Sequence, residues 1–182
     1  MSKDQQSKPQ GTAGRLLKAG RTLLLYALIL LVGGVAGNIW MTRNQASGPA
    51  PVLIGQALDG EIRRVDYAGL KRPLLVYFFA DWCPICKVQN SAIESIAGDF
   101  PVIAVAMQSG DLANVSAYVE SQQLDLDVLN DASGRLSRDF AVTGVPASFI
   151  IDRQGHIRSS THGYTSQLSL RARLWLTEAD WL

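Results

Sequence analysis

Two cysteines, Cys83 and Cys86, are the residues of this chain best suited to chemistry, and the chain has no others. An apolar run at residues 74–80 ends shortly before them, and a helical pattern begins at Pro84. Cys83 is therefore expected at a helix N-terminus, where unpaired backbone N–H groups and the helix dipole stabilise a thiolate. Cys86 lies one helical turn later, close enough to bond to Cys83. This spacing predicts a pair that alternates between dithiol and disulfide, in which Cys83 attacks a partner disulfide and Cys86 resolves the mixed disulfide.

Four other roles are open to the pair. A purely structural disulfide would close too small a loop to stabilise the fold much. A closed zinc site needs about four ligands, and the two histidines, His156 and His162, lie far away in the sequence. Covalent haem attachment requires a histidine directly after the second cysteine, where this chain has Lys87. A Cu(I) site formed by both thiolates is chemically feasible, but thiol–disulfide exchange fits the position of the pair best.

A proline directly before a predicted strand is the second candidate feature. It is Pro146, in the segment TGVPASF at residues 143–149, 60 residues after Cys86. Most X–Pro peptide bonds are trans. The sequence alone therefore leaves open both an ordinary loop proline and a cis proline.

The elements that must position these residues alternate between strands and helices. Strands are predicted at 61–66, 74–80, 102–107, 148–152 and 156–160, and helices at 84–97, about 111–121, 135–141 and 167 to about 176. The run at 74–80 is typical of a central strand buried on both faces. The inner face of the helix at 84–97 is assigned to Ile85, Val88, Ala92, Ile93 and Ile96. This order indicates an α/β fold with a central mixed β-sheet flanked by helices.

An apolar segment at residues 22–41 precedes this body. It contains 20 residues and no charge, and as a helix it would span roughly 30 Å, the thickness of a bilayer core. Residues 1–21 carry five basic side chains, whereas Arg43 alone follows the segment closely. By the positive-inside rule, residues 1–21 form a cytoplasmic tail, residues 22–41 a transmembrane signal-anchor helix, and the body lies across the membrane. A cleaved signal peptide with a site at 35–37, or a buried helix of a soluble protein, are the alternatives.

The rest of the chain divides into a linker at residues 42–54, rich in small residues and proline, and one domain at residues 55–182. The net charge of +1 over 182 residues indicates no nucleic-acid partner. A hydrophobic content of 47% excludes a fully disordered chain. The sequence has no glycine-rich phosphate loop, Ser-His-Asp set or paired-carboxylate site, and no cofactor or metal is expected.

Together, the segments YFFADWCPIC and GVPASFIID and the downstream Gly163 resemble the thioredoxin superfamily. The resemblance covers most of residues 55–182 and implies a thioredoxin fold. It also implies that Pro146 is cis and packs beside the cysteines, and that the Val145 backbone holds an extended substrate segment by strand-like pairing. Trp82 is implied to shield the cysteine pair and to offer a surface to the partner.

The predicted anchor narrows the resemblance to exported, membrane-tethered thioredoxin-like proteins of bacteria, which include the TlpA/ResA group and the cytochrome c maturation thioredoxins. Within these, the chain is most similar to the suppressor for copper sensitivity protein D type. The resemblance implies a single-pass protein of the bacterial inner membrane with its C-terminal domain in the periplasm. It further implies protein disulfides as substrates and a transmembrane thiol reductase as electron donor.

Two positions depart from the pattern of these families. Many thioredoxins carry a buried aspartate six residues before the first cysteine, where this chain has Tyr77. The cytochrome maturation group commonly has glutamate three residues after the second cysteine, where this chain has Gln89. A neutral amide cannot take a thiol proton as a carboxylate does. The usual proton acceptors for Cys86 are therefore missing, and Gln89 also argues against a dedicated role in cytochrome maturation.

The resulting hypothesis is a periplasmic disulfide reductase that acts through Cys83 and Cys86, with a link to copper tolerance. Pro84 and Ile85, between the cysteines, offer no clear extra donor to the thiolate. This favours an intermediate or reducing potential over that of a strong oxidant. A Cu(I)-binding module and a cytochrome c maturation thiol reductase are the alternatives.

Overall fold

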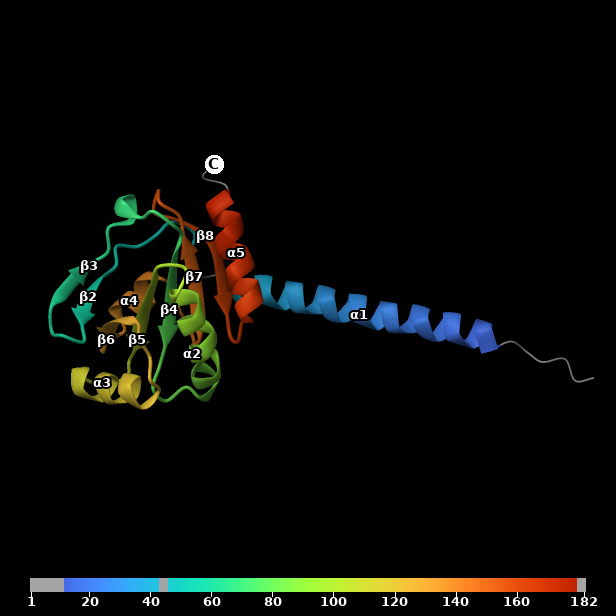
Figure 1. The fold of residues 1–182 in the computed structure, drawn as a ribbon, viewed down its shortest axis with the longest axis horizontal. Helices are drawn as coiled ribbons and strands as arrows, with labels where there is room; N and C mark the ends of the chain where they lie inside the picture. The colour runs from blue at the N-terminus through green and yellow to red at the C-terminus, as the bar shows by residue number, and fades with distance from the viewer. Residues whose placement is uncertain (1–11, 43–45, 180–182) are drawn as a thin grey trace, which may run out of the picture. The chain divides into compact units, whose positions relative to one another are not determined.

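The computed structural model describes residues 12–42 and 46–179, and the chain forms two compact units, a long helix and a folded domain (Figure 1). The first unit contains all but the last two residues of helix α1 (Thr12–Thr42), in which the 18 residues Gly20–Gly37 have a mean hydropathy of 1.7 and are not buried. A helical stretch of this length spans about 27 Å, close to the thickness of a bilayer core. The helix predicted at 22–41 is therefore present, begins earlier, and is long and apolar enough to cross a membrane, as an anchor or a signal sequence would.

The folded domain is built on one eight-stranded mixed sheet with the strand order β1-β8-β7-β4-β5-β6-β2-β3. The strands are β1 (Gly48–Pro49), β2 (Ile54–Ala57), β3 (Ile62–Arg64), β4 (Leu74–Phe79), β5 (Val102–Met107), β6 (Asp127–Asp131), β7 (Ala147–Ile151) and β8 (His156–His162). The pairs β4–β5 and β5–β6 are parallel, and the other neighbours are antiparallel. The helices of the domain are η1 (Tyr67–Gly69), α2 (Pro84–Ala97), α3 (Leu112–Ser121), α4 (Arg135–Asp139) and α5 (Gln167–Ala179).

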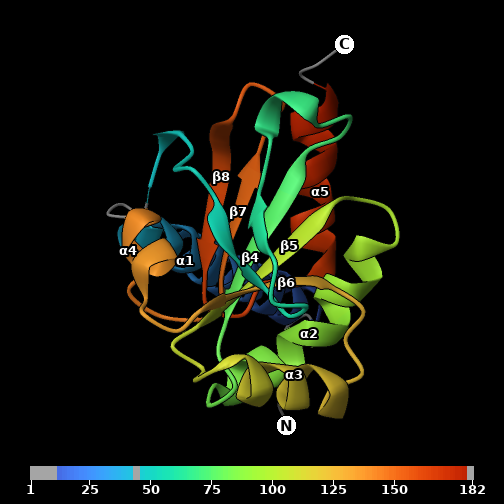
Figure 2. The same cartoon turned by 90° about the vertical axis from the view of Figure 1, so that its left-hand side faces the viewer.

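Strand β4 runs through the middle of the sheet and buries all six of its residues. Because side chains alternate along a strand, its residues enter two hydrophobic clusters on opposite faces. Tyr77 and Phe79 pack with residues of α2, α3 and α5, whereas Phe78 packs with Phe140 and Phe149 beside α4. Figure 2 shows α4 and α5 on opposite sides of the sheet. The predicted α/β architecture, with helices on both faces of a mixed sheet, is confirmed.

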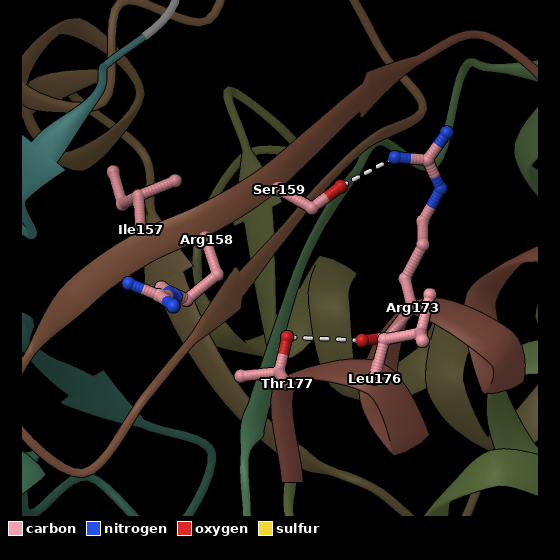
Figure 3. A pocket seen from close by; sticks show the side chains of 6 residues that line it. All are labelled: Ile157, Arg158, Ser159, Arg173, Leu176 and Thr177. Carbon is pink, nitrogen blue, oxygen red and sulfur yellow. Dashed lines mark hydrogen bonds between the residues drawn. The ribbon is translucent and has the colours of Figure 1, made fainter. Parts of the chain in front are cut away.

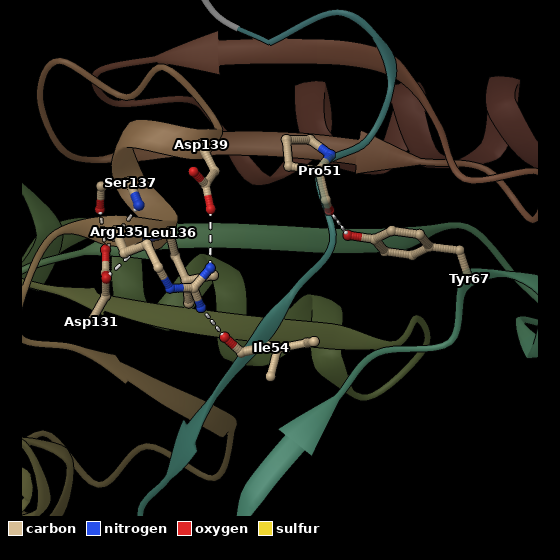
Figure 4. Close-up of polar contacts among 8 residues, drawn as sticks. All are labelled: Pro51, Ile54, Tyr67, Asp131, Arg135, Leu136, Ser137 and Asp139. Carbon is tan, nitrogen blue, oxygen red and sulfur yellow. Dashed lines mark hydrogen bonds and ion pairs between the residues drawn. The ribbon is translucent and has the colours of Figure 1, made fainter.

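The domain extends further toward the N-terminus than the predicted boundary at residue 55. β1 pairs with the edge strand β8, and Leu53 is completely buried, although both lie in the predicted linker at 42–54. The hydroxyl of Tyr67 donates to the carbonyl of Pro51 at 2.7 Å (Figure 4). The segment is rich in glycine, alanine and proline and lacks the alternation that marks a strand. Its sheet partner, β8, lies far along the chain, which is why the sequence does not reveal that the segment is part of the fold.

Strand β6 is not predicted from the sequence either. It ends in Asp131, a buried carboxylate that accepts hydrogen bonds from the backbone N–H groups of Leu136 at 3.0 Å and Ser137 at 2.8 Å (Figure 4). These bonds satisfy donors at the start of α4, as a helix cap does. Arg135, on the same helix, donates to the carbonyl of Ile54 on β2. The aspartates at both ends of β6, Asp127 and Asp131, interrupt the apolar pattern that would predict a strand. The role of Asp131 as a cap depends on contacts that form only in the folded domain.

Candidate active site

Cys83 and Cys86 form a disulfide at the first turn of α2. Cys83 is the N-cap residue, with an extended backbone, and Pro84 follows in the first turn, where its missing N–H costs no hydrogen bond. The backbone N–H of Cys86 donates to Cys83 Sγ at 3.1 Å. The two Cα atoms are 5.3 Å apart, within the usual range for a disulfide. The predicted placement of the pair, at the end of a buried strand and the start of a helix, is confirmed.

The two sulfurs differ in their access to solvent. Cys83 is 4% exposed, whereas Cys86 is completely buried. A partner disulfide can therefore reach Cys83 more readily than Cys86. The N–H group that points at Cys83 Sγ, together with the helix N-terminus, would stabilise negative charge on that sulfur after reduction.

The peptide bond between Val145 and Pro146 is cis, as the resemblance implied. Cys83 Sγ lies 3.6 Å from the carbonyl oxygen of Val145, a residue 62 positions later in the chain. In the disulfide Cys83 carries no S–H, so this is a close contact; in the dithiol form the thiol could donate a hydrogen bond there. The structure thus brings the cysteine pair and the proline segment together.

Apolar side chains surround the cysteine pair on the surface. Trp82, Ile85 and Val88 are 60%, 50% and 64% exposed. The assignment of Ile85 and Val88 to the inner face of this helix was wrong, because Gln89 and Asn90 are buried there instead. Both polar residues have hydrogen-bond partners inside the domain, and these bonds offset the cost of removing the two side chains from water.

Trp82 is held in its exposed position by the loop that follows β5. Its indole N–H donates to the carbonyl of Gln108 at 3.3 Å. The neighbouring Asp81 N–H donates to Ser109 Oγ at 3.1 Å. Sequence reasoning missed Gln108 and Ser109, since a loop without a motif gives no signal of such contacts.

A network of neutral polar groups lies next to Cys86. The hydroxyl of the fully buried Tyr77 is 3.2 Å from Asn90 Oδ1 and 3.4 Å from the carbonyl oxygen of Cys86. Asn90 Nδ2 donates to the hydroxyl of Tyr118 at 3.1 Å. Burial raises the pKa of Tyr77 above its ordinary value, and burial likewise raises the pKa of Tyr118. Tyr77 therefore stays protonated at neutral pH and is not a base for the Cys86 thiol.

Both ends of the Gln89 side-chain amide also have hydrogen-bond partners. Its Oε1 accepts from the backbone N–H of Thr165 at 2.9 Å, and its Nε2 donates to the carbonyl of Thr165 at 2.8 Å. The two positions at which related families carry acids are thus occupied here by neutral side chains with hydrogen-bond partners. Nothing in the sequence indicated Thr165 as a partner.

A hollow of about 420 Å³ lies between β8 and α5 and does not include the cysteine pair (Figure 3). It is lined by Ile157, Arg158, Ser159, Arg173, Leu176 and Thr177. Inside it Arg173 donates to Ser159 Oγ, and Thr177 Oγ1 donates to the Arg173 carbonyl at 2.9 Å. The cysteines do not line this hollow. Within residues 12–42 and 46–179, no group of three or more His, Cys, Asp and Glu side chains is arranged to hold a metal ion.

Comparison with known proteins places this site in a family. Residues 47–160, more than half of the chain, match the model of the AhpC/TSA family. The chain belongs to the AhpC/TSA family. One relative is the thiol:disulfide interchange protein DsbE of Pseudomonas aeruginosa, 30% identical over 128 residues that cover 69% of this chain and 71% of that protein. Another is the sporulation thiol-disulfide oxidoreductase A of Bacillus subtilis, 24% identical over 79% of this chain and 90% of that protein.

Solved structures agree with the fold of this AhpC/TSA family member. A crystal structure of a thiol:disulfide interchange protein from Chlorobium tepidum, of the thioredoxin family, superposes with a TM-score of 0.59. It is 25% identical and covers 72% of this chain and 97% of its own. The thioredoxin fold expected from the sequence is confirmed. With its Cys-x-x-Cys pair and these relatives, the chain is a thiol–disulfide oxidoreductase of the DsbE type.

Proposed function

We propose that this oxidoreductase is a membrane-anchored reductase of protein disulfides, with Cys83 as nucleophile and Cys86 as resolving thiol. The observation that carries the proposal is the position of Cys83 Sγ, at the N-terminus of α2 and 3.6 Å from the Val145 carbonyl, beside cis Pro146. The Val145 backbone pairs with an extended substrate segment. The exposed Trp82 contacts the partner, and Pro84 starts the helix that stabilises the Cys83 thiolate.

The reaction has two exchange steps. In the first, the Cys83 thiolate attacks one sulfur of the substrate disulfide, a mixed disulfide forms, and the other substrate sulfur leaves as a thiolate. In the second, the Cys86 thiolate attacks Cys83 Sγ, the mixed disulfide breaks, and the second substrate thiolate leaves. The substrate gains two electrons and, after protonation, carries two thiols. The chain is left with the Cys83–Cys86 disulfide that the structure contains.

The apolar helix supports a membrane setting for this reaction. Residues 22–41 cross the bacterial inner membrane, the basic residues 1–21 lie in the cytoplasm, and the domain lies in the periplasm. A transmembrane thiol reductase then supplies electrons to the disulfide. The resemblance to the suppressor for copper sensitivity protein D type supports repair of thiols that copper oxidises as the purpose of the reaction.

The in-cell redox state of the pair tests the direction of electron flow. Cells are quenched with acid, free thiols are tagged with a bulky alkylating reagent, and the shift is observed on a gel. A pair that is mostly reduced in an oxidising compartment supports an electron supply and the reductase assignment. A fully oxidised pair would show that the direction is wrong.

Two variants test the roles of the cysteines and the alternatives. Cys83→Ala is expected to abolish insulin reduction, and Cys86→Ala to accumulate mixed disulfide. A Cu(I)-binding module would show neither effect and would hold Cu(I) against a competing chelator. A role in cytochrome c maturation would require that deletion of the protein lower covalent haem attachment.

A further inference from the structure

Gln89 is a buried polar side chain that no step of the exchange reaction uses. Only 1% of it is exposed, and both ends of its amide bond to the backbone of one residue, Thr165, at 2.9 and 2.8 Å. Two hydrogen bonds between the same two residues fix both the distance between Gln89 and Thr165 and the orientation of one relative to the other. It joins the turn of α2 that follows Cys86 to the segment between β8 and α5.

This segment is in turn joined to the proline side of the site. Thr165 Oγ1 donates to the carbonyl of Gly163 at 3.3 Å, and the N–H of Gly163 donates to the carbonyl of Pro146 at 2.8 Å. Val145 precedes that proline and contacts Cys83 Sγ at 3.6 Å. The contacts therefore form a closed loop of interactions that leaves α2 at its second turn and returns to the helix at its N-cap, Cys83.

We propose that Gln89 is a positioning residue for exchange with protein disulfides. Through Thr165 and Gly163 it keeps the Val145–Pro146 backbone in register with Cys83. This inference rests on the proposed function, because it takes the Val145 backbone as the edge that pairs with the substrate.

A neutral amide suits this role better than a carboxylate does. Thr165 presents one donor and one acceptor to the side chain, and the amide of Gln89 matches both. An ionised carboxylate would match the N–H alone, and its second oxygen would face the Thr165 carbonyl, where two acceptors repel. A protonated carboxyl group would match both again. An alanine side chain would match neither, and the segment would lose its tie to α2.

The first test compares a protein substrate with a small one. The full-length chain in detergent reduces insulin with dithiothreitol as electron source. For Ellman's reagent, a small disulfide that needs no strand pairing, the chain is first reduced and then freed of dithiothreitol, because dithiothreitol itself reduces this reagent. Gln89→Ala is expected to raise KM for insulin on the order of tenfold, the effect of losing one or two hydrogen bonds. The kcat for insulin and the rate with Ellman's reagent should stay within about twofold of the unsubstituted chain.

The outcomes separate this inference from the proposed function. An unchanged KM in Gln89→Ala, with normal activity of the unsubstituted chain, would overturn the inference alone. An unsubstituted chain that reduces neither substrate would overturn the proposed function. Circular dichroism of each variant checks that the domain has folded.

The second test is a pH profile of Gln89→Glu, which also decides the matter if Gln89→Ala does not fold. KM for insulin should be near normal at low pH, where the introduced carboxyl is protonated, and should rise as pH increases and the group ionises. A proton acceptor at this position would instead raise kcat above that of the unsubstituted chain at the same pH once the carboxyl ionises, and that result would refute the positioning role. Gln154→Glu adds the same group to an exposed turn and should leave the profile unchanged.

Discussion

Replacing Tyr77 by phenylalanine removes one oxygen atom from the buried network beside Cys86. Tyr77 is completely buried, and burial keeps its phenol neutral by raising its pKa. We therefore expect Tyr77→Phe to lower the stability of the domain and to leave its chemistry unchanged.

The size of the expected loss in stability follows from Asn90, the hydrogen-bond partner that remains when the Tyr77 hydroxyl is removed. Asn90 Oδ1, bonded to the Tyr77 hydroxyl at 3.2 Å, would become a buried acceptor without that donor, in a side chain that is 3% exposed. Such a loss costs about 2 kcal/mol of unfolding free energy. The ring contact with Phe79, 5.9 Å between centroids, is kept because the ring itself remains.

Tyr118→Phe is the matched control. Its hydroxyl bonds to the same asparagine, through Asn90 Nδ2 at 3.1 Å, but Tyr118 is only half-buried. Water can replace the lost hydroxyl there, so we expect a cost of about 1 kcal/mol. Urea denaturation followed by circular dichroism measures both values. Single-turnover reduction of insulin at several pH values measures the chemistry of the same proteins.

Two results would refute this reasoning. If Tyr77→Phe lowered the unfolding free energy no more than Tyr118→Phe, the burial of Asn90 Oδ1 without its donor would not determine the loss of stability. If Tyr77→Phe slowed the resolving step tenfold or shifted its pH profile, the phenol would take part in proton transfer.

Three further predictions concern other parts of the domain. Burial raises the pKa of Tyr67 from 10.0 to about 12, so the stability that this group contributes is complete below about pH 10 and is lost as pH rises toward 12. In Tyr67→Phe the unfolding free energy should fall less steeply over that window in urea titrations, and parallel curves would contradict this. Asp131→Ala should cost about 3 kcal/mol, since three hydrogen bonds at 2.7–3.0 Å to Leu136 and Ser137 are lost; a loss under about 1 kcal/mol in urea denaturation would show that α4 needs no cap. Trp82→Ala should raise KM for insulin about fivefold and change the unfolding free energy by less than about 1 kcal/mol, because the side chain is 60% exposed; an unchanged KM would remove Trp82 from the partner surface.

Much of the site could be predicted because its local pattern is strong. The run at 74–80 and the helix after Pro84 are regular elements whose residues agree with their environment, and they place Cys83 at an N-cap. The cis isomer of the Val145–Pro146 bond could not be predicted from the residues alone, since the local preference is for trans. Only the resemblance to the thioredoxin superfamily implied it. The buried face of α2 was predicted incorrectly, because hydrophobic periodicity ignores polar side chains that find partners inside a domain.

The sequence by itself determined which atoms can react and the element that presents them. Two cysteines one turn apart, after a buried strand and around Pro84, specify the redox pair through chain connectivity and helix geometry alone. Tertiary structure decided what surrounds the pair. The contact between Cys83 and Val145, and the pairing of Gln89 with Thr165, join residues 62 and 76 positions apart. Their geometry depends on how β4, β7 and β8 align in one sheet, and no local sequence pattern encodes that alignment.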